Sequence, residues 1–171
     1  MMKFTSILPK IDEPGARRLE LKESGPGLTD PKYLSHSYKS IFAVEDDTVI
    51  GQVKLYKRWI TFSYASLLIG GLGGIAVQDH RLEQDISTEL MRRGIKQLRK
   101  DECTLIFMSP ASDSLANLGF RRLKMGVTFK DRTGHREFNN SVMVSNGILL
   151  KDTVRKIALV DEYIDIGVGY W

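Results

Sequence analysis

The segment from Leu82 to Leu98 has the most regular hydrophobic pattern in this sequence. Apolar residues recur in it every three or four positions, on one side of a helical projection: Leu82, Ile86, Leu90, Met91, Ile95 and Leu98. This spacing predicts an amphipathic helix of about five turns with one apolar stripe. A helix of this kind buries its stripe against another element, so the chain needs a sheet or a second helix beside it.

Two segments that predict strands flank this helix. Residues 67–77 precede it and contain four glycines: Gly70, Gly71, Gly73 and Gly74. Glycines inside a strand indicate a bulge, or a place where another backbone comes close. Residues 103–108 follow it as a short continuous apolar run, typical of a strand buried on both faces. A strand–helix–strand unit implies a right-handed parallel crossover, with a ligand site at the carboxyl ends of its strands.

The remaining patterns predict antiparallel strands and one short helix. Residues 41–45 and 49–55 favour a hairpin that turns at Asp46-Asp47, and residues 59–62 begin a second pair with 67–77. Ser109 and Pro110 suit the start of a short helix that ends at Gly119.

Further strands are expected at 123–129 and 138–144, joined by a turn at 132–135, and a short helix at 31–39. The predicted class is α/β (α+β), a mixed, mostly antiparallel twisted sheet with a central strand–helix–strand crossover.

Length and composition limit the functions that this chain can have. Its 171 residues, 42% of them hydrophobic, fit one globular domain. The most apolar stretch, Ser66–Val77, has about 12 residues where a membrane span needs about 20. No signal-peptide pattern is visible, and the lone Cys103 permits no internal disulfide and suits a reducing compartment. We therefore expect a protein without a membrane span, of cytoplasmic location.

The sequence pI is near 9.2, and two basic clusters contribute much of it. The first is on the predicted helix: Arg92, Arg93, Lys96, Arg99 and Lys100. The second follows Gly119: Arg121, Arg122, Lys124, Lys130, Arg132 and Arg136. A solvated helix face explains the first cluster. A phosphate-bearing partner, either a nucleotide or nucleic acid, is the other interpretation of both.

The order of these elements resembles the GNAT superfamily of N-acetyltransferases. The resemblance covers about 41–144, with 43–53 similar to that family's second and third strands. Residues 74–77 are similar to the end of its fourth strand, and Leu115-Ala116-Asn117-Leu118-Gly119-Phe120 is similar to its segment ending in Leu-Gly-Phe. This resemblance divides the chain into an N-terminal segment 1–40, a core 41–146 and a C-terminal extension 147–171.

The resemblance implies an acetyl-CoA site that is degenerate here. The family's loop Arg-Gly-x-Gly-x-Gly/Ala cradles the pyrophosphate with backbone N–H groups, and Glu83, Asp85 and Ser87 occupy its glycine positions. Main-chain pairing with pantetheine does not depend on the identity of the side chains, so residues 75–77 could still provide it. The hydroxyl groups of residues 87 and 88 could bind a phosphate. The cofactor-binding candidates are therefore Ile75, Ala76, Val77, Ser87 and Thr88.

The acid and base of the family are also absent from their usual places. Residues 67–77 contain no carboxylate or histidine to serve as a general base, and Leu115 occupies the position of the family's tyrosine. Ser109, near the expected acyl group, and His80, beside the loop, are weak catalytic candidates. A helix cap and an exposed loop residue are the plainer interpretations of these two, and Cys103 suits the core. His36 and His135 show no partner spacing, and no metal site is expected.

The chain becomes more apolar towards its C-terminus, where chain ends are normally polar and frayed. A short helix is expected around 154–160, followed by an alternating aromatic segment that needs a groove on its own domain or on a partner. The candidate partner-binding residues are Tyr163, Ile164, Ile166, Val168, Tyr170 and Trp171.

Two classes of function fit these patterns. The first is a non-catalytic structural or regulatory module that needs no cofactor and binds a protein partner or a second copy through the tail. A faint similarity to GNAT-like bacteriophage proteins adds a virion role and location to this class. The alternative is an acetyl-CoA-dependent N-acetyltransferase acting on an amine that the sequence does not identify.

Overall fold

The computed structural model describes residues 2–7, 36–78 and 84–170. A seven-stranded sheet has the order β1-β2-β3-β4-β5-β9-β6. Its strands are Met2–Thr5, Lys39–Glu45, Thr48–Phe62, Ala65–Val77, Leu105–Met108, Met143–Asn146 and Arg121–Arg122, in that order. All neighbouring strands are antiparallel except β4 and β5, which the helix α2 (Gln84–Lys100) connects. The predicted mixed sheet with a parallel crossover is confirmed.

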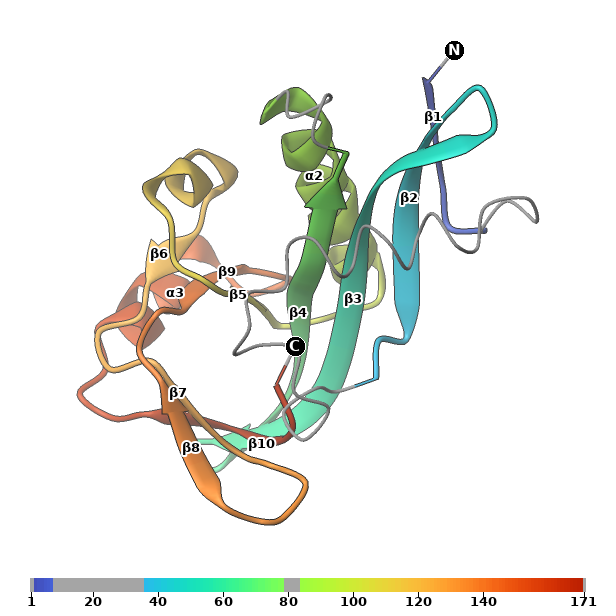
Figure 1. Cartoon of the computed structure of the whole chain (residues 1–171). Helices are drawn as coiled ribbons and strands as arrows, with labels where there is room; N and C mark the ends of the chain where they lie inside the picture. Colours follow the sequence, from blue (N-terminus) through green and yellow to red (C-terminus); the bar gives the residue numbers. More distant parts are fainter. Residues whose placement is uncertain (1, 8–35, 79–83, 171) are drawn as a thin grey trace.

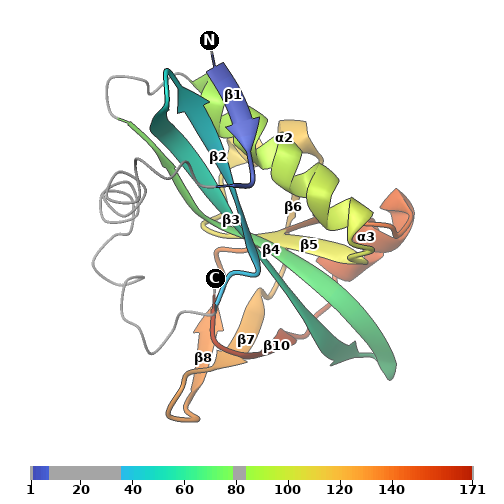
Figure 2. The ribbon, with the colours of Figure 1, turned by 90° about the vertical axis from the view of Figure 1, so that its right-hand side faces the viewer.

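The helix α2 covers one face of this sheet (Figure 2). The predicted stripe is buried from Ile86 onwards, because Ile86, Leu90, Met91, Ile95 and Leu98 all belong to one core cluster. Its first residue, Leu82, lies outside the described residues. Glycines allow the close approach that the sequence indicated. A Cβ on Gly70 would lie 2.9 Å from Leu98 Cδ2, and a Cβ on Gly94 would lie 2.5 Å from Leu72 Cδ2. Each glycine therefore makes room for a leucine side chain of the element that faces it.

Strand β3 is longer than the sequence predicted. It runs without interruption through residues 48–62, so the two expected hairpins share it as a common strand. Both turns use positive φ at residues other than glycine: 45° and 63° at Asp46 and Asp47, and 47° and 66° at Ser63 and Tyr64. Two successive left-handed residues match the right-handed twist of the flanking strands.

A second sheet has the order β10-β7-β8, with bounds Ile164–Val168, Val127–Lys130 and Arg136–Asn139. It packs with α3 (Lys151–Ala158) on the face opposite α2. The two faces separate along β5, because Ile106 and Met108 join the α2 cluster while Leu105 and Phe107 join the other. The prediction of a strand buried on both faces is confirmed at 105–108.

Several predicted boundaries are wrong. The strand expected at 138–144 is divided between β8 and β9, which belong to different sheets. The strand expected at 123–129 begins only at Val127. The helix expected at 31–39 is wrong at its C-terminal end, because β2 begins at Lys39. Residues 31–35 lie outside the described residues. The short helix is the 3₁₀ helix η2 (Asp113–Leu118), with Ser112 before it. Ser109 is therefore not its cap, whereas Gly119 ends it as predicted, with φ of 84°.

Candidate functional site

Strands β4 and β5 separate at the end of their pairing. Their register runs from Ile69 opposite Leu105 to Leu72 opposite Met108, where β5 ends. Strand β4 continues to Val77 and, within the described residues, pairs there only with β3. Figure 1 shows β4 extending past β5 towards the N-terminal end of α2. Among the described strands, one edge of residues 73–77 therefore has no neighbour.

A bulge in β4 produces this separation. Gln52 of β3 lies opposite Ala76 and Lys54 opposite Gly73, so β4 uses one residue more than β3 over this interval. Gly74 adopts a φ of 52°, and an added Cβ would meet the Lys54 side chain at 3.0 Å. An extra residue bends its strand and increases the local twist. The predicted bulge is confirmed, and it turns the end of β4 away from β5.

The predicted cofactor-binding residues lie along this bent edge and at the start of α2. Ile75 is half-buried, Ala76 and Val77 are buried, and Gln78 closes the strand against β3 through its backbone N–H to Ile50 O at 2.9 Å. Only the main chain of residues 75–77 therefore suits pairing with a ligand. Ser87 and Thr88 are half-buried in the first turns of α2, whereas Glu83 and His80 lie outside the described residues.

Ser109 directly follows β5 and joins this edge to the second sheet. The Asn139 amide Nδ2 donates to Ser109 Oγ at 3.3 Å, and the Ala111 N–H donates to Ser141 Oγ at 3.0 Å. The hydroxyl of Ser109 also acts on the pKa of Tyr170, which comes from the far end of the chain. The sequence separation between Ser109 and Tyr170 explains why no local pattern indicated this contact.

Tyr170 is buried, and its ring packs on Phe129 with centroids 4.9 Å apart. Burial raises the pKa of Tyr170 to about 12, while the nearby Ser109 hydroxyl acts in the opposite direction. The phenol is therefore protonated at neutral pH and can donate a hydrogen bond.

Arg58 of β3 holds the segment that carries Tyr170. Its guanidinium nitrogen Nη1 donates to the carbonyl oxygens of Ile166, Val168 and Gly169 at 2.8, 2.7 and 2.9 Å. Burial lowers the pKa of Arg58 from its usual value, because a charge is held away from bulk water. Neutral carbonyl dipoles bind this cation.

The other residues that the sequence singled out have structural roles or lie apart from β4. Cys103 is buried, and burial raises its pKa to about 11. Leu115 is 3% exposed and packs beneath α2. His36 is exposed, and His135 lies in the β7–β8 turn, its Nδ1 2.7 Å from Thr133 Oγ1.

The candidate partner-binding residues of the tail divide into two groups. Ile164, Ile166 and Tyr170 are buried in the chain's own second core, so these three side chains offer no surface to a partner. Val168 is 62% exposed and Tyr163 partly so, and Trp171 lies outside the described residues. The groove that holds Tyr170 is thus on its own domain.

The described ranges 2–7, 36–78 and 84–170 contain no group of three His, Cys, Asp or Glu side chains arranged to hold a metal ion. No helix in these ranges is long and apolar enough to cross a membrane.

Comparison with known proteins agrees with this architecture. Residues 22–121 match the family described as acetyltransferase (GNAT) domain, and the chain belongs to this family. No curated protein matches the chain.

Among solved structures, YhbS from Escherichia coli in complex with CoA has a TM-score of 0.58 and 16% identity, covering 98% of this chain and 88% of its own. A GNAT acetyltransferase from Brucella melitensis in complex with acetyl-CoA has a TM-score of 0.51 and 20% identity, covering 71% and 83%.

Eis1 from Mycobacterium abscessus has a TM-score of 0.58 and 13% identity over 75% of this chain and 33% of its own, so this chain spans a third of its length. At these identities the comparisons establish the fold.

Proposed function

We propose that the protein binds an acyl-CoA along the unpaired edge of β4 and transfers the acyl group to an amine. The bulge at Gly74, which separates β4 from β5 beyond Leu72 and Met108, is the observation that carries this proposal. Among the described strands, β3 alone pairs with residues 75–77, so an amide-containing ligand would pair with the other edge of this segment, beginning at the half-buried Ile75. The CoA and acetyl-CoA complexes of the two similar structures support it.

We expect two carboxylates, which the sequence aligns with glycines of the family's loop, to weaken this binding. A carboxylate about 5 Å from a phosphate charge costs roughly 3 kcal/mol at an effective dielectric of about 20. That energy corresponds to about a hundredfold loss of affinity. Glu83 and Asp85 each contribute such a charge in the position where the family has glycine, so we expect an affinity well below that of a glycine-rich loop.

In the transfer step the amine nitrogen attacks the thioester carbon, the carbon–sulfur bond breaks, and the amine loses one proton as the thiolate gains one. The phenol of Tyr170 is a hydrogen-bond donor for charge that develops at the acyl end. With a pKa of about 12 it is a weaker acid than a thiol, whose ordinary pKa is about 8.5, so it does not drive protonation of the thiolate. Ser109, hydrogen-bonded to Asn139, adds a second hydroxyl.

The binding half of the proposal is tested by titrating acetyl-CoA into the full chain in a calorimeter. The variant Glu83→Gln/Asp85→Asn removes only charge, and we expect it to bind at least about tenfold more tightly. The variant Glu162→Gln removes one exposed charge far along the chain and is the control, with unchanged affinity. No saturable binding by the wild type and by the charge variant would contradict the proposal.

The transfer half is tested by following the release of free thiol from acetyl-CoA with a panel of amines. We expect amine-dependent release that Tyr170→Phe lowers about three- to tenfold, the value of one hydrogen bond. Tyr163→Phe is the matched control, because the Tyr163 ring makes an edge contact with Phe138 at 5.1 Å, away from Ser109.

A second candidate function is that of a non-catalytic module, which has the GNAT fold but does not catalyse acyl transfer. Two features of the sequence favour this candidate: the carboxylates of Glu83 and Asp85, and Leu115 in the position of the family's tyrosine. Saturable binding of acetyl-CoA without amine-dependent thiol release would support this candidate over the enzyme.

A further inference from the structure

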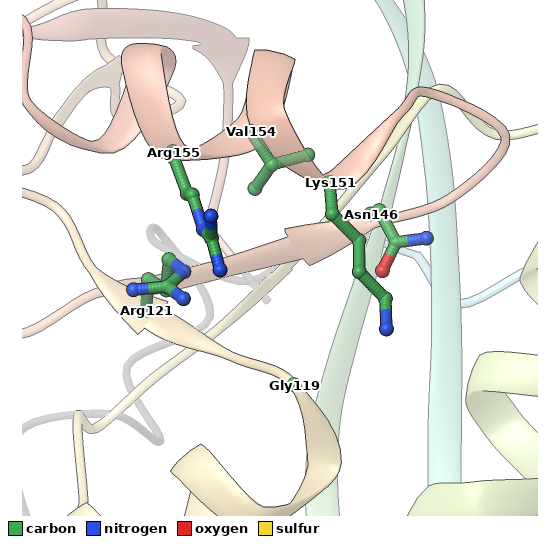
Figure 3. Close-up of a pocket in the computed structure, with 6 residues that line it drawn as sticks. All are labelled: Gly119, Arg121, Asn146, Lys151, Val154 and Arg155. Carbon is green, nitrogen blue, oxygen red and sulfur yellow. The ribbon is translucent and has the colours of Figure 1, made fainter.

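A pocket of about 180 Å³ lies between α3 and the edge strand β6, on the sheet face opposite α2. Figure 3 shows its lining, which comes from three separate segments of the chain. The lining residues are Gly119, Arg121, Asn146, Lys151, Val154 and Arg155.

The register of the sheet explains how the floor of the pocket forms. Arg121 of β6 pairs with Val144 of β9, and Arg122 pairs with Met143. Val144 belongs to the core cluster that contains α3, whereas Met143 belongs to the α2 cluster. Because side chains alternate across a sheet, Arg121 faces α3 and Arg122 faces the other way. Val154 of α3, 3% exposed, closes the pocket from beneath.

Three cationic side chains point into this pocket. Figure 3 shows the guanidinium groups of Arg121 and Arg155 turned towards one another, with Lys151 extending towards the same opening. Within the described part of the chain, neither Arg121 nor Lys151 forms an ion pair. Arg155 bonds Asp152 at 3.1 Å, but the Asp152 side chain is 81% exposed, so water screens this pair.

Arg99 of α2 places a further positive charge beside Asn146, one of the lining residues. Its guanidinium donates to the backbone oxygen of Asn146 at 3.1 and 3.2 Å and to Asn146 Oδ1 at 3.2 Å. Arg99 belongs to the first basic cluster that the sequence indicated, and Arg121 to the second.

We propose that this pocket binds a phosphate group, as inorganic phosphate or the monoester of a small molecule. Arginine pairs suit phosphate because their planar donors match its oxygens. The volume is smaller than the ~300–1,000 Å³ of sites for drug-sized ligands, so the pocket admits a single group. The cations converge on a recess and do not form a stripe along an element, which favours a small phosphate over a nucleic-acid strand.

This site is distinct from the edge of β4. Arg99 is in the last turn of α2, whereas the loop that would hold a pyrophosphate precedes its first turn. A helix of 17 residues spans about 25 Å at 1.5 Å per residue. The proposal is therefore independent of acyl-CoA binding.

The test is a titration of the full chain with inorganic phosphate and, separately, glycerol phosphate, followed by amide NMR shifts at constant ionic strength. We expect saturable shifts at residues 119–121 and 151–155. Arg121→Gln/Lys151→Gln should weaken binding at least about tenfold. Arg122→Gln, on the same strand but on the other face, should change it less than about twofold, and thermal melts of both variants check that they fold.

Each other outcome overturns the proposal. Absence of saturation at high phosphate concentration would show that the pocket is not a site. Equal weakening by Arg122→Gln would show nonspecific attraction to a basic surface. Tighter binding of a single-stranded oligonucleotide, weakened equally by the Arg122 and Arg121/Lys151 variants, would indicate a nucleic-acid surface instead. Displacement of phosphate by acetyl-CoA would show that the two sites are one.

Discussion

Single side chains set the shape of the β7–β8 turn. Asp131 is 4% exposed, and its Oδ1 accepts hydrogen bonds from Thr133 Oγ1 at 2.7 Å and from the N–H groups of Thr133 and His135 at 2.9 Å each. These bonds favour the charged carboxylate, and the Thr133 hydroxyl contributes most to lowering the pKa of Asp131.

This geometry predicts a pH dependence. Because the folded pKa of Asp131 lies below its unfolded value of about 3.9, the carboxylate contributes stability above that value and loses it as pH falls through the folded pKa. Asp131→Asn should therefore destabilise the protein at pH 7, and the difference should vanish at strongly acidic pH. Denaturant melts across pH check this. A difference that is constant with pH would contradict it.

The core beneath α2 also depends on single residues. Leu90 is fully buried and lies over β3, where a Cβ on Gly51 would meet Leu90 Cδ1 at 3.1 Å. Leu90→Ala should cost about 2–5 kcal/mol, because it removes apolar contacts and leaves a cavity. Urea melts measure this loss, with the exposed Val168→Ala as a control that should cost much less. A cost below about 1 kcal/mol for Leu90→Ala would contradict the burial of this helix face.

At the scale of elements, β10 depends on a cation from a distant strand. Three carbonyl oxygens of residues 166–169 accept from Arg58, and β10 otherwise pairs only with β7 among the described strands. Arg58 therefore attaches this segment to β3, in addition to its pairing with β7.

Replacing this cation should loosen β10 first. Arg58→Met keeps the aliphatic stem and leaves three carbonyls without their donor, at a cost of about 2–3 kcal/mol. Hydrogen exchange of the amides of 164–169 should accelerate before that of α2. Lys57→Met removes a charge from the other face of β3 and should leave this exchange unchanged. Equal acceleration throughout the chain would show that Arg58 acts on the whole fold.

At the scale of the whole molecule, the last residues complete the second core. Ile164, Ile166 and Tyr170 are buried with residues of β3, β5, β7 and α3. Truncation after Asp161 should therefore lower the melting temperature strongly or prevent folding. Thermal melts of the truncated and full chains measure this. An unchanged melt would show that the tail is not part of the core.

Association through the tail stays a prediction and needs a variant that spares the core. Val168 is 62% exposed, so Val168→Asp should leave the melting temperature unchanged. Sedimentation of this variant and the wild type then tests association alone. A smaller assembly for the variant would support docking, and equal sedimentation of two monomers would contradict it.

Local patterns in the sequence by themselves determined the central unit of the fold. The apolar stripe of α2, the glycines of β4 and the apolar run of β5 are all patterns within short stretches of sequence. Such patterns indicate the type of each element because periodicity is a local property. The four glycines of β4 indicated a bulge or a close approach without giving its position, and Gly119 located the end of η2, where the backbone is left-handed.

Only the tertiary structure decided which elements pair and which side chains meet. Alternation shows that residues 138–144 are extended, but not that β8 and β9 belong to different sheets. The contacts of Tyr170 with Ser109, of Arg58 with the tail, and of Arg121 with α3 join residues far apart in sequence. Such contacts depend on how all the apolar faces pack together, and no local window of the sequence contains that information.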